Sequence, residues 1–277
     1  MNISQALNIA KDQLTYSKTP ALDAEVLLAF LLHVSRSYLF AWPEKLLSSA
    51  EEARYVELIR EASQGKPIAY ITGHQEFWSL DLLVTSDVLI PRPETELLVE
   101  KTLSLYPSNA EIKVADLGTG SGAIALALAN ERKNWKIVAT DQSGAALAVA
   151  KKNASRLAIH TICWSQGNWC EALPSEQFDI IVSNPPYIDI QDPCLKCNGL
   201  PYEPQLALVS SNKGLSDIET IIVQSKNYLK ICGYILLEHG YNQARLVREL
   251  LSKFGYRDIV SYRDLAKLER VTIAKKS

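Results

Sequence analysis

The residues best suited to binding chemistry form a glycine-rich segment, Asp-Leu-Gly-Thr-Gly-Ser-Gly-Ala, at residues 116–123. Glycines let the backbone approach a ligand closely and adopt angles closed to other residues. The helix expected behind this loop begins with unpaired N–H groups that can also face a ligand. Asp141 follows 19 positions after Gly122, at the end of the next expected strand, where a carboxylate can bind both hydroxyls of a ribose. The candidate cofactor contacts of the loop are Asp116, Gly118, Thr119, Gly120, Ser121 and Gly122.

Three interpretations of this loop stay open from its residues alone: an S-adenosylmethionine site, a dinucleotide site and a structural turn. The spacing Gly118-x-Gly120-x-x-Ala123, with Asp141 beyond it, also satisfies the fingerprint of NAD-binding proteins. Asp116 favours the first interpretation, because a carboxylate two residues before the first glycine would repel a pyrophosphate. S-adenosylmethionine instead has a cationic ammonium and a sulfonium, which an acidic neighbourhood favours.

A second polar segment, Asn184-Pro185-Pro186-Tyr187, directly follows the apolar strand expected at residues 178–183. The carboxyl ends of parallel strands meet at one edge of an open α/β sheet, so this corner should lie in the same crevice as the glycine loop. The two prolines lack an N–H and have a fixed φ, which gives the carbonyls around them fixed directions. The Asn184 side-chain oxygen and the Pro185 carbonyl then form a rigid pair of acceptors beside the ring of Tyr187.

An acceptor pair next to an aromatic ring suits a flat NH2 group, which has two N–H donors and a π face for stacking. An amide nitrogen is a poor nucleophile because its lone pair is delocalised, as a rotation barrier of roughly 18–20 kcal/mol indicates. Methylation makes that nitrogen positive, so acceptors aimed at its hydrogens stabilise the transition state more than the ground state. Asn184, Pro185 and Tyr187 are the candidate catalytic residues, and Pro186 completes the candidate substrate site. The alternative for this tetrapeptide is a proline-stiffened loop that only ends a strand.

The elements that must position these motifs alternate between strand, tight turn and helix from about residue 112 onward. This alternation predicts a parallel, doubly wound sheet. Two β-like runs near the C-terminus, 256–261 and 270–274, have a short connection and predict an antiparallel end, which a plain dinucleotide fold lacks. The expected strands of the parallel part are 113–117, 137–141, 161–165, 178–183 and 234–238, and the expected helices are 123–132, 144–156 and 215–229.

The N-terminal part of the chain has a helical pattern. The Thr-Pro pair at 19–20 is typical of an N-cap and a first helical residue. Ser49 and Glu52 fit a capping box that begins a further helix. Alternating residues around 80–84, after a turn-rich stretch, predict a short hairpin. We expect three parts, which are a helical domain at 1–75, a β-hairpin linker at 76–87 and an α/β domain at 88–277.

Composition limits the function classes and the partners. A formal net charge of −2 offers no net positive field for a long stretch of nucleic acid, although a local basic patch is still open. Apolar runs such as 26–32 fall short of the roughly 20 residues that cross a bilayer, so no membrane partner is expected. Five scattered cysteines do not form a disulfide framework, and the cytoplasm is the expected compartment. Cys194-x-x-Cys197 has no second pair at ligand spacing, so no metal site is expected.

With these motifs the sequence strongly resembles the release factor glutamine methyltransferases, the PrmC/HemK family. The likeness covers nearly the whole chain. Pro-Arg-Pro-Glu-Thr-Glu at 91–96, together with Asn-Pro-Pro-Tyr at 184–187, is highly specific for that family. Further matching segments are 67–73, 202–204, 237–240 and 269–271.

The resemblance implies a Rossmann-like class I S-adenosylmethionine-dependent methyltransferase sheet with antiparallel C-terminal strands. It also implies a small all-helical N-terminal domain that helps to hold a protein substrate. The implied reaction is methylation of the side-chain amide nitrogen of the glutamine in the Gly-Gly-Gln motif of class 1 peptide chain release factors, with S-adenosylmethionine as cofactor.

Particular residues take their expected roles from the same resemblance. Residues 118–122, Asp141 and Asn184 match cofactor contacts, and residues 184–187 match the glutamine-binding turn. Trp169 matches the aromatic residue that packs on the adenine. Asn168 stands where relatives often have an acidic residue, and Lys267 stands where a glycine is common.

Two other classes stay open beside this family. A nucleic-acid amino methyltransferase would also bind a flat NH2, on adenine or guanine, but it would need a basic channel. The near-neutral charge argues against direct nucleic-acid binding. A scaffold that binds a cofactor and docks to a translation factor without catalysis is the non-enzyme alternative. Outside the two motifs, we expect a structural role for His239 and lid positions over the cofactor for Arg92 and Glu94.

Overall fold

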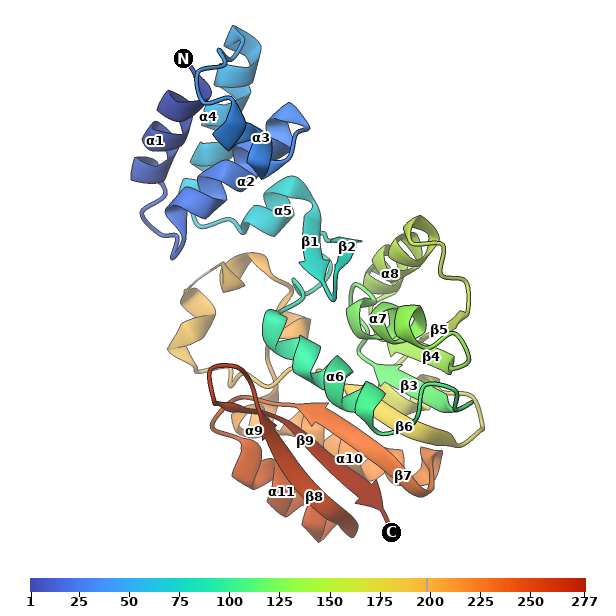
Figure 1. The fold of residues 1–277 in the computed structure, drawn as a ribbon. Coiled ribbons are helices and arrows are strands. Elements are labelled where there is room, and N and C mark those ends of the chain that lie inside the picture. Colours follow the sequence, from blue (N-terminus) through green and yellow to red (C-terminus); the bar gives the residue numbers. More distant parts are fainter. Residues whose placement is uncertain (198) are drawn as a thin grey trace. The chain divides into compact units, whose positions relative to one another are not determined.

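The computed structural model describes residues 1–197 and 199–277, which divide into two compact units (Figure 1). We call them the helical unit, Met1–His74 with Pro193–Tyr202, and the sheet unit, Gln75–Asp192 with Glu203–Ser277. The segment from Pro193 to Tyr202 groups with the helices although it lies between two parts of the sheet unit in the chain. No local pattern in the sequence indicates this excursion, because it depends on contacts between residues far apart in the chain.

The helical unit has a compact apolar core to which Ile3, Leu27 and Leu58 contribute fully buried side chains. Thr19 is the N-cap of the second helix and Pro20 its first residue, as predicted. Since proline has no N–H to leave unpaired, it suits this first helical position. The helices of this unit are α1 (Ile3–Gln13), α2 (Pro20–Leu32), α3 (Arg36–Ala41), α4 (Ser49–Ser63) and α5 (Ile68–Thr72).

The capping box of α4 lies one residue earlier than predicted. Ser48, not Ser49, is the N-cap, and its hydroxyl accepts a hydrogen bond from the backbone N–H of Glu51 at 3.3 Å. The Glu51 carboxylate accepts from the backbone N–H of Ser48 at 2.7 Å. The prediction with Ser49 and Glu52 was wrong because consecutive serines and consecutive glutamates offer two registers with the same spacing.

The predicted hairpin is confirmed as a two-stranded sheet of β1 (His74–Phe77) and β2 (Leu80–Leu83). The two residues between the strands, Trp78 and Ser79, have φ angles of 51° and 59°. Positive φ at both positions is the mark of a type I′ turn, whose twist matches that of the strands. The amide of Asn153 in helix α8 (Gly144–Arg156) anchors the second strand, since it accepts from the Leu83 N–H at 2.7 Å and donates to the Leu83 carbonyl at 2.9 Å.

The sheet unit is built on seven strands in the order β5-β4-β3-β6-β7-β9-β8. Strands β5, β4, β3, β6 and β7 are parallel, whereas β9 is antiparallel to both of its neighbours. The predicted parallel sheet with an antiparallel C-terminal end is therefore confirmed. The strands are β3 (Lys113–Leu117), β4 (Lys136–Asp141), β5 (Ile162–Gln166), β6 (Phe178–Ser183), β7 (Leu229–Glu238), β8 (Tyr256–Arg263) and β9 (Glu269–Lys276).

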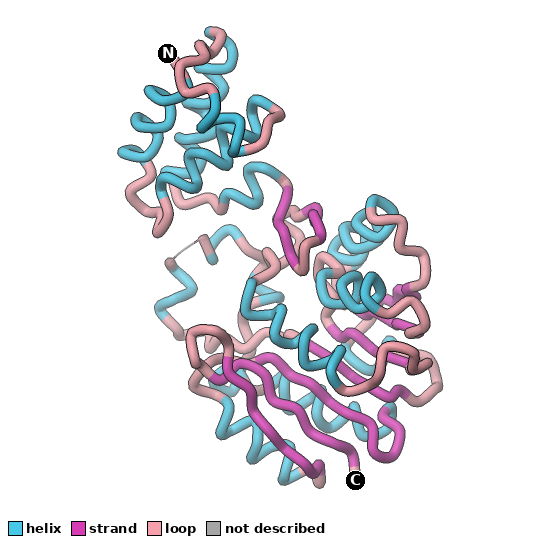
Figure 2. The backbone as a smooth tube through the Cα atoms, in the orientation of Figure 1, coloured by secondary structure: helices cyan, strands magenta, loops and turns pink. Residues whose placement is uncertain are grey.

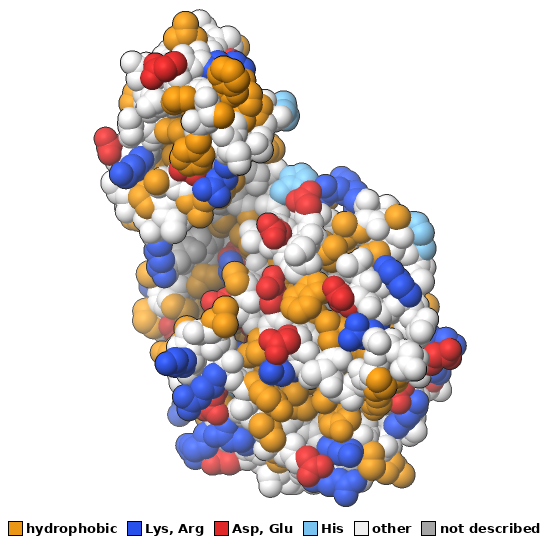
Figure 3. Space-filling view, in the orientation of Figure 1, with side chains coloured by type: hydrophobic (Ala, Val, Ile, Leu, Met, Phe, Trp, Pro, Cys, Tyr) orange, Lys and Arg blue, Asp and Glu red, His pale blue; other side chains and the backbone are white. Residues whose placement is uncertain are grey.

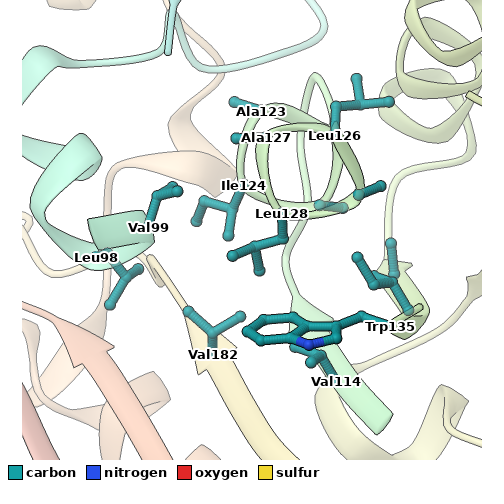
Figure 4. Close-up of a cluster of buried hydrophobic side chains, with 14 of the residues drawn as sticks. Leu98, Val99, Val114, Ala123, Ile124, Leu126, Ala127, Leu128, Trp135 and Val182 are labelled. Atoms are coloured by element: carbon teal, nitrogen blue, oxygen red, sulfur yellow. The ribbon is translucent and has the colours of Figure 1, made fainter. Parts of the chain in front are cut away.

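Helices cover both faces of this sheet (Figure 2). Because successive side chains of a strand point to opposite faces, each strand contributes to two cores. Val114 and Val182 pack with α6 and α7 on one face, as the close-up in Figure 4 shows. Ala115 and Ile181 pack with α10 and α11 on the other face. The helices of the sheet unit are α6 (Glu96–Ser104), α7 (Ala123–Glu131), α8 (Gly144–Arg156), α9 (Ser211–Gly214), α10 (Ser216–Tyr228) and α11 (Ala244–Lys253).

The strand register aligns the ends of the four central parallel strands. Leu117 of β3 pairs with Thr140 of β4 and with Ser183 of β6, and Ser183 pairs in turn with Leu237 of β7. The chain order of strands reverses between β3 and β6, and this switch point opens the crevice where open α/β sheets bind ligands. The residues that come next along this edge are Gly118, Asp141, Asn184 and Glu238.

Candidate cofactor and substrate site

A cleft lies at the carboxyl edge of the sheet unit. Residues without a predicted role in the site also line it, among them residues 87–89, Pro204 and residues 206–207. The predicted site residues that line it are Gly118, Gly120, Asp141, Trp169, Asn184 and Pro186.

The glycine loop follows β3 closely against the end of β4. The backbone N–H groups of Gly118 and Thr119 both donate to the carbonyl of Thr140 at 2.9 Å. Gly118 has a φ of +72°, and a Cβ at this position would lie 3.0 Å from Cζ3 of the Trp169 ring. Glycine is thus required both for the backbone angle and for the approach of the indole to the loop.

Asp141 connects the loop to the second strand. Its Oδ2 accepts from the Gly120 N–H and its Oδ1 from the Ser143 N–H, each at 2.9 Å. Burial raises the pKa of Asp141, while these two backbone hydrogen bonds act in the opposite direction. A carboxylate oxygen has two lone pairs, so each oxygen can still accept from a ligand hydroxyl in the cleft.

Asp116 lies behind the loop rather than along the cleft. The side chain is fully buried, and its Oδ2 accepts from the Thr119 hydroxyl at 2.6 Å and from the Ala125 N–H at 3.2 Å. Its Oδ1 has no partner among the residues that the structure describes. Burial raises the pKa of Asp116 to about 7. The carboxyl group therefore stabilises the loop through Oδ2, and Oδ1 can still accept a hydrogen bond.

The remaining loop residues shape the backbone. The Thr119 and Ser121 side chains are buried, and the Ser121 carbonyl accepts from the Asn153 amide at 3.0 Å. Gly122 donates from its N–H to the Thr119 carbonyl at 2.8 Å, which closes the turn into α7. Asn153 therefore joins the glycine loop to the hairpin strand β2.

The corner after β6 places an amide at the wall of the cleft. Asn184 is half-buried, and its Nδ2 donates to the Thr95 hydroxyl oxygen at 3.2 Å. The nitrogen is committed in this way, so Oδ1 is the atom of the amide that can accept from a ligand. Pro185 and Pro186 behind it are buried, and the Ser183 hydroxyl donates to the Leu117 carbonyl at 2.7 Å. The corner is consequently fixed to the same strand end as the glycine loop.

Tyr187 ends the corner and is held through its backbone. Its carbonyl accepts from Gln243 Nε2 at 2.9 Å. Gly214, with a φ of +80°, approaches so closely that a Cβ there would lie 2.0 Å from the Tyr187 carbonyl oxygen. Burial raises the pKa of the Tyr187 phenol well above its usual range, and the nearby Glu238 acts in the same direction.

An ion pair connects the two additional walls of the cleft. Arg92 Nη2 contacts Glu203 Oε1, and Glu203 Oε2 accepts from the Ile90 N–H at 3.2 Å. Glu203 is buried, whereas Arg92 is partly exposed. The pair joins the segment before α6 to the segment that follows Tyr202. Arg92 is thus fixed beside the cleft.

His239 is fully buried beside the site and has partners on both ring nitrogens. Nδ1 is 3.0 Å from the Gly240 carbonyl and Nε2 is 2.8 Å from the Thr272 hydroxyl. A carbonyl can only accept, so Nδ1 carries the proton and donates to it. Burial lowers the pKa of His239, which favours the neutral ring. These contacts fit the structural role expected for this residue.

Five residues of the site were not assigned a contact role from the sequence. Thr95 and Glu203 lie in segments that carry the family resemblance, which is the one feature of the sequence that could have indicated a role for them in the site. The other residues have no diagnostic spacing, because each acts through one tertiary contact. These are Asn153, Gly214 and Gln243.

The arrangement can bring two ligands together. The glycine loop, Asp141 and Trp169 line one part of the cleft, and the acceptor of Asn184 lines another. Within the described part of the chain, no group of three or more His, Cys, Asp or Glu side chains is arranged to hold a metal ion. Every described helix is too short or too polar to traverse a bilayer.

The sheet order, its antiparallel end and the loop after β3 define a class I methyltransferase fold. Residues 93–194 match the family described as methyltransferase small domain, and residues 5–73 match the PrmC N-terminal domain. A methyltransferase structure from Pyrococcus furiosus aligns with a TM-score of 0.55 at 18% identity, covering 83% of this chain and all of that one. At this identity the likeness concerns the fold alone.

Relatives of much higher identity define the family. The release factor glutamine methyltransferase of Coxiella burnetii is 49% identical over 97% of this chain and 96% of its own length. The protein of the same name from Shewanella oneidensis is 46% identical over 99% of this chain and 96% of its own length. The chain belongs to the release factor glutamine methyltransferase family. The predicted family, fold class and cofactor, S-adenosylmethionine, are confirmed by these matches.

Proposed function

We propose that this protein transfers a methyl group from S-adenosylmethionine to the side-chain amide nitrogen of the glutamine in the Gly-Gly-Gln motif of class 1 peptide chain release factors. The observation that carries the proposal is the Asn184 amide at the wall of the cleft, with its nitrogen bound to Thr95 and its oxygen left as acceptor. The names of relatives that match nearly the whole chain agree with this substrate.

The residues present suit the cofactor. The Asp141 carboxylate would bind the ribose hydroxyls, and the Trp169 ring would cover the adenine. The fully buried Asp116 retains an acceptor atom without a described partner, and its carboxyl group lies behind a loop that would face a cationic ligand. When bound, S-adenosylmethionine supplies a methyl group on a positively charged sulfur.

The corner after β6 would bind the amide to be methylated. Asn184 Oδ1 would accept one amide hydrogen and the Pro185 carbonyl the other, while the Tyr187 ring would flank the amide plane. As the nitrogen becomes positive, these fixed acceptors stabilise the transition state more than the ground state. No general base is required before the new bond forms, because the alkylated nitrogen becomes strongly acidic.

We further propose that the helical domain, residues 1–75, helps to hold the protein substrate, with the hairpin at 76–87 as linker to the catalytic domain at 88–277. The helical unit exposes large apolar side chains in and after α3: Phe40, Trp42 and Leu46 are 64%, 60% and 75% exposed. If they contact the release factor, Trp42→Ser should raise the KM for that protein without changing affinity for S-adenosylmethionine. An unchanged KM would argue against this role.

The charge pattern also suits a protein substrate in the cytoplasm. The formal net charge is −2, and on the face of the sheet unit seen in Figure 3 acidic and basic side chains are interspersed. We therefore do not include direct binding of nucleic acid in the proposal.

The proposal is tested by methyl transfer to a purified release factor. Incubation with methyl-labelled S-adenosylmethionine should label the factor, and replacement of its Gly-Gly-Gln glutamine by alanine should abolish the labelling. Equal labelling of the two factors would reject this substrate residue. Label on RNA or DNA with none on the protein would instead indicate a nucleic-acid methyltransferase.

A further inference from the structure

The Thr95 hydroxyl lies between the side chains of Asn184 and Glu238. Asn184 Nδ2 donates to Thr95 Oγ1 at 3.2 Å, and the Thr95 hydroxyl lies close enough to the Glu238 carboxyl group to lower its pKa. Thr95 is 4% exposed and Glu238 1% exposed. The three residues come from the turn before α6, the end of β6 and the end of β7.

The sheet itself brings Glu238 to this place. Ser183 and Leu237 are register partners, so the residues that follow them, Asn184 and Glu238, leave neighbouring strands at the same level. A buried carboxyl group is costly unless it is hydrogen-bonded. The hydroxyls of Thr95 and Tyr187 lie near this carboxyl group and lower its pKa, while Glu238 Oε2 has no hydrogen-bond partner in the described part of the chain.

The donor and acceptor groups of Asn184, Thr95 and Glu238 determine how the Asn184 amide is oriented. A hydroxyl has one proton, and an ionised carboxylate can only accept. With Glu238 ionised, Thr95 can direct its proton toward that carboxylate, and a lone pair of the same hydroxyl oxygen accepts from the Asn184 NH2 group. An amide with its nitrogen turned to Thr95 has its oxygen turned to the other side.

We propose that Thr95 and Glu238 are positioning residues that hold the Asn184 amide with its oxygen toward the substrate NH2 group. The inference rests on the proposed function, since it assigns an orienting role to residues behind the same acceptor. Burial raises the pKa of Glu238 to about 7, whereas the nearby Thr95 hydroxyl, Arg270 and Tyr187 act in the opposite direction and Glu94 acts in the same direction as burial.

Loss of the Thr95 hydroxyl would leave the amide free to turn. In the turned state the Asn184 NH2 group would face the substrate NH2 group. Both groups are donors, so no hydrogen bond could form between them. Thr95→Val removes the hydroxyl at nearly constant volume, and it should lower kcat about tenfold, the worth of one hydrogen bond. The Kd of S-adenosylmethionine should stay unchanged, and Thr95→Ser should recover most of the lost rate.

Thr102→Val is the matched control. Thr102 is a fully buried threonine in α6 whose hydroxyl donates to the Leu98 carbonyl at 2.7 Å, away from Asn184. The control reports how much of the effect arises from removal of a buried hydroxyl as such. Thr102→Val should leave kcat unchanged in the same methyl-transfer assay with a release factor.

A double-mutant cycle with Asn184→Ala separates orientation from general damage. If Thr95 acts through the amide, Thr95→Val should lower kcat in the wild-type background and should have no further effect in the Asn184→Ala background. Glu238→Met should likewise lower kcat, and it should add nothing once the Thr95 hydroxyl is gone. Cofactor affinity, measured by calorimetry for each variant, shows that the cleft is still formed.

The outcomes distinguish this inference from the proposed function. If the wild-type protein labels no release factor, the proposed function fails. If the wild-type protein is active but Thr95→Val matches Thr102→Val, the positioning role is rejected. The positioning role is also rejected if Thr95→Val lowers kcat by the same factor in the wild-type and Asn184→Ala backgrounds. Additive losses from Glu238→Met and Thr95→Val would reject the part assigned to Glu238.

Discussion

The backbone N–H of Gly120 donates to Oδ2 of Asp141 at 2.9 Å, so the carboxylate expected to bind the cofactor ribose also holds the glycine loop. A charge-assisted hydrogen bond contributes about 1.5–3 kcal/mol. Asp141→Ala should therefore weaken binding of S-adenosylmethionine by about 10-fold to 100-fold. Isothermal titration of the variant against Asp12→Ala, an exposed carboxylate in the helical unit, measures this effect. Equal affinities of the two variants would remove Asp141 from the cofactor site.

Gly214 should be indispensable for the shape of the substrate corner. A Cβ there would lie 2.0 Å from the Tyr187 carbonyl oxygen, so Gly214→Ala must displace the turn. The matched control is Gly65→Ala, which has a similar φ of +88° but no atom within 4 Å of the added Cβ. Both variants carry the conformational cost of a left-handed alanine, about 1–2 kcal/mol. Only Gly214→Ala should also lower the rate of methyl transfer, and equal rates for the two would contradict the role of the corner.

Asn184→Ala should lower kcat by about 10²-fold to 10³-fold, the usual loss when one preorganised dipole at a transition state is removed. The affinity for S-adenosylmethionine should change little, because Asp141 and the loop stay in place. Single-turnover rates and calorimetry on the same preparation separate the two quantities. A parallel loss of cofactor affinity would mean that Asn184 mainly binds the cofactor.

The buried Asp116 should make stability depend on pH in a particular direction. Burial raises its pKa from 3.8 to about 7, so the folded protein holds the proton more tightly than the unfolded chain. The stability contributed by the protonated form is present below the unfolded pKa and is lost as pH rises toward 7. In the wild-type protein this loss is at most about 1.4 kcal/mol per pH unit between pH 4 and 7. In Asp116→Asn it should disappear.

Urea unfolding of the wild-type protein and of Asp116→Asn across this pH range measures the difference between them. As pH rises from 4 to 7, the free energy of unfolding of the wild-type protein should fall relative to that of the variant. Parallel curves would show that Asp116 has the same pKa in the folded and unfolded states. Asp141 and Glu238, whose pKa values burial also raises, are present in both proteins, so the comparison isolates the substitution at Asp116.

The sequence predicted the central sheet well because its strands are short apolar runs buried on both faces. The expected strands at 113–117 and 178–183 agree with β3 and β6 at both ends. Strand β7 begins at Leu229, five residues earlier than expected, since its first residues pair with β6 across an irregular register. Local propensity does not predict such pairing, which depends on the neighbouring strand.

The candidate site was predictable where function imposes a residue type at a fixed spacing. Gly118 and Asp141 line the cleft because consecutive strands of a parallel sheet end at the same edge. The contact between Thr95 and Asn184 joins residues 89 positions apart and leaves no periodic trace in the sequence. Interactions of this kind, which orient a residue rather than contact a ligand, required the folded structure.

The most direct test of the account is a crystal structure of the protein with S-adenosylhomocysteine and a peptide that contains Gly-Gly-Gln. The account predicts the Asn184 oxygen at about 2.7–3.2 Å from the glutamine amide nitrogen, with the Asn184 nitrogen still on Thr95. An Asn184 oxygen turned away from the glutamine, with the peptide amide bound elsewhere in the cleft, would contradict it.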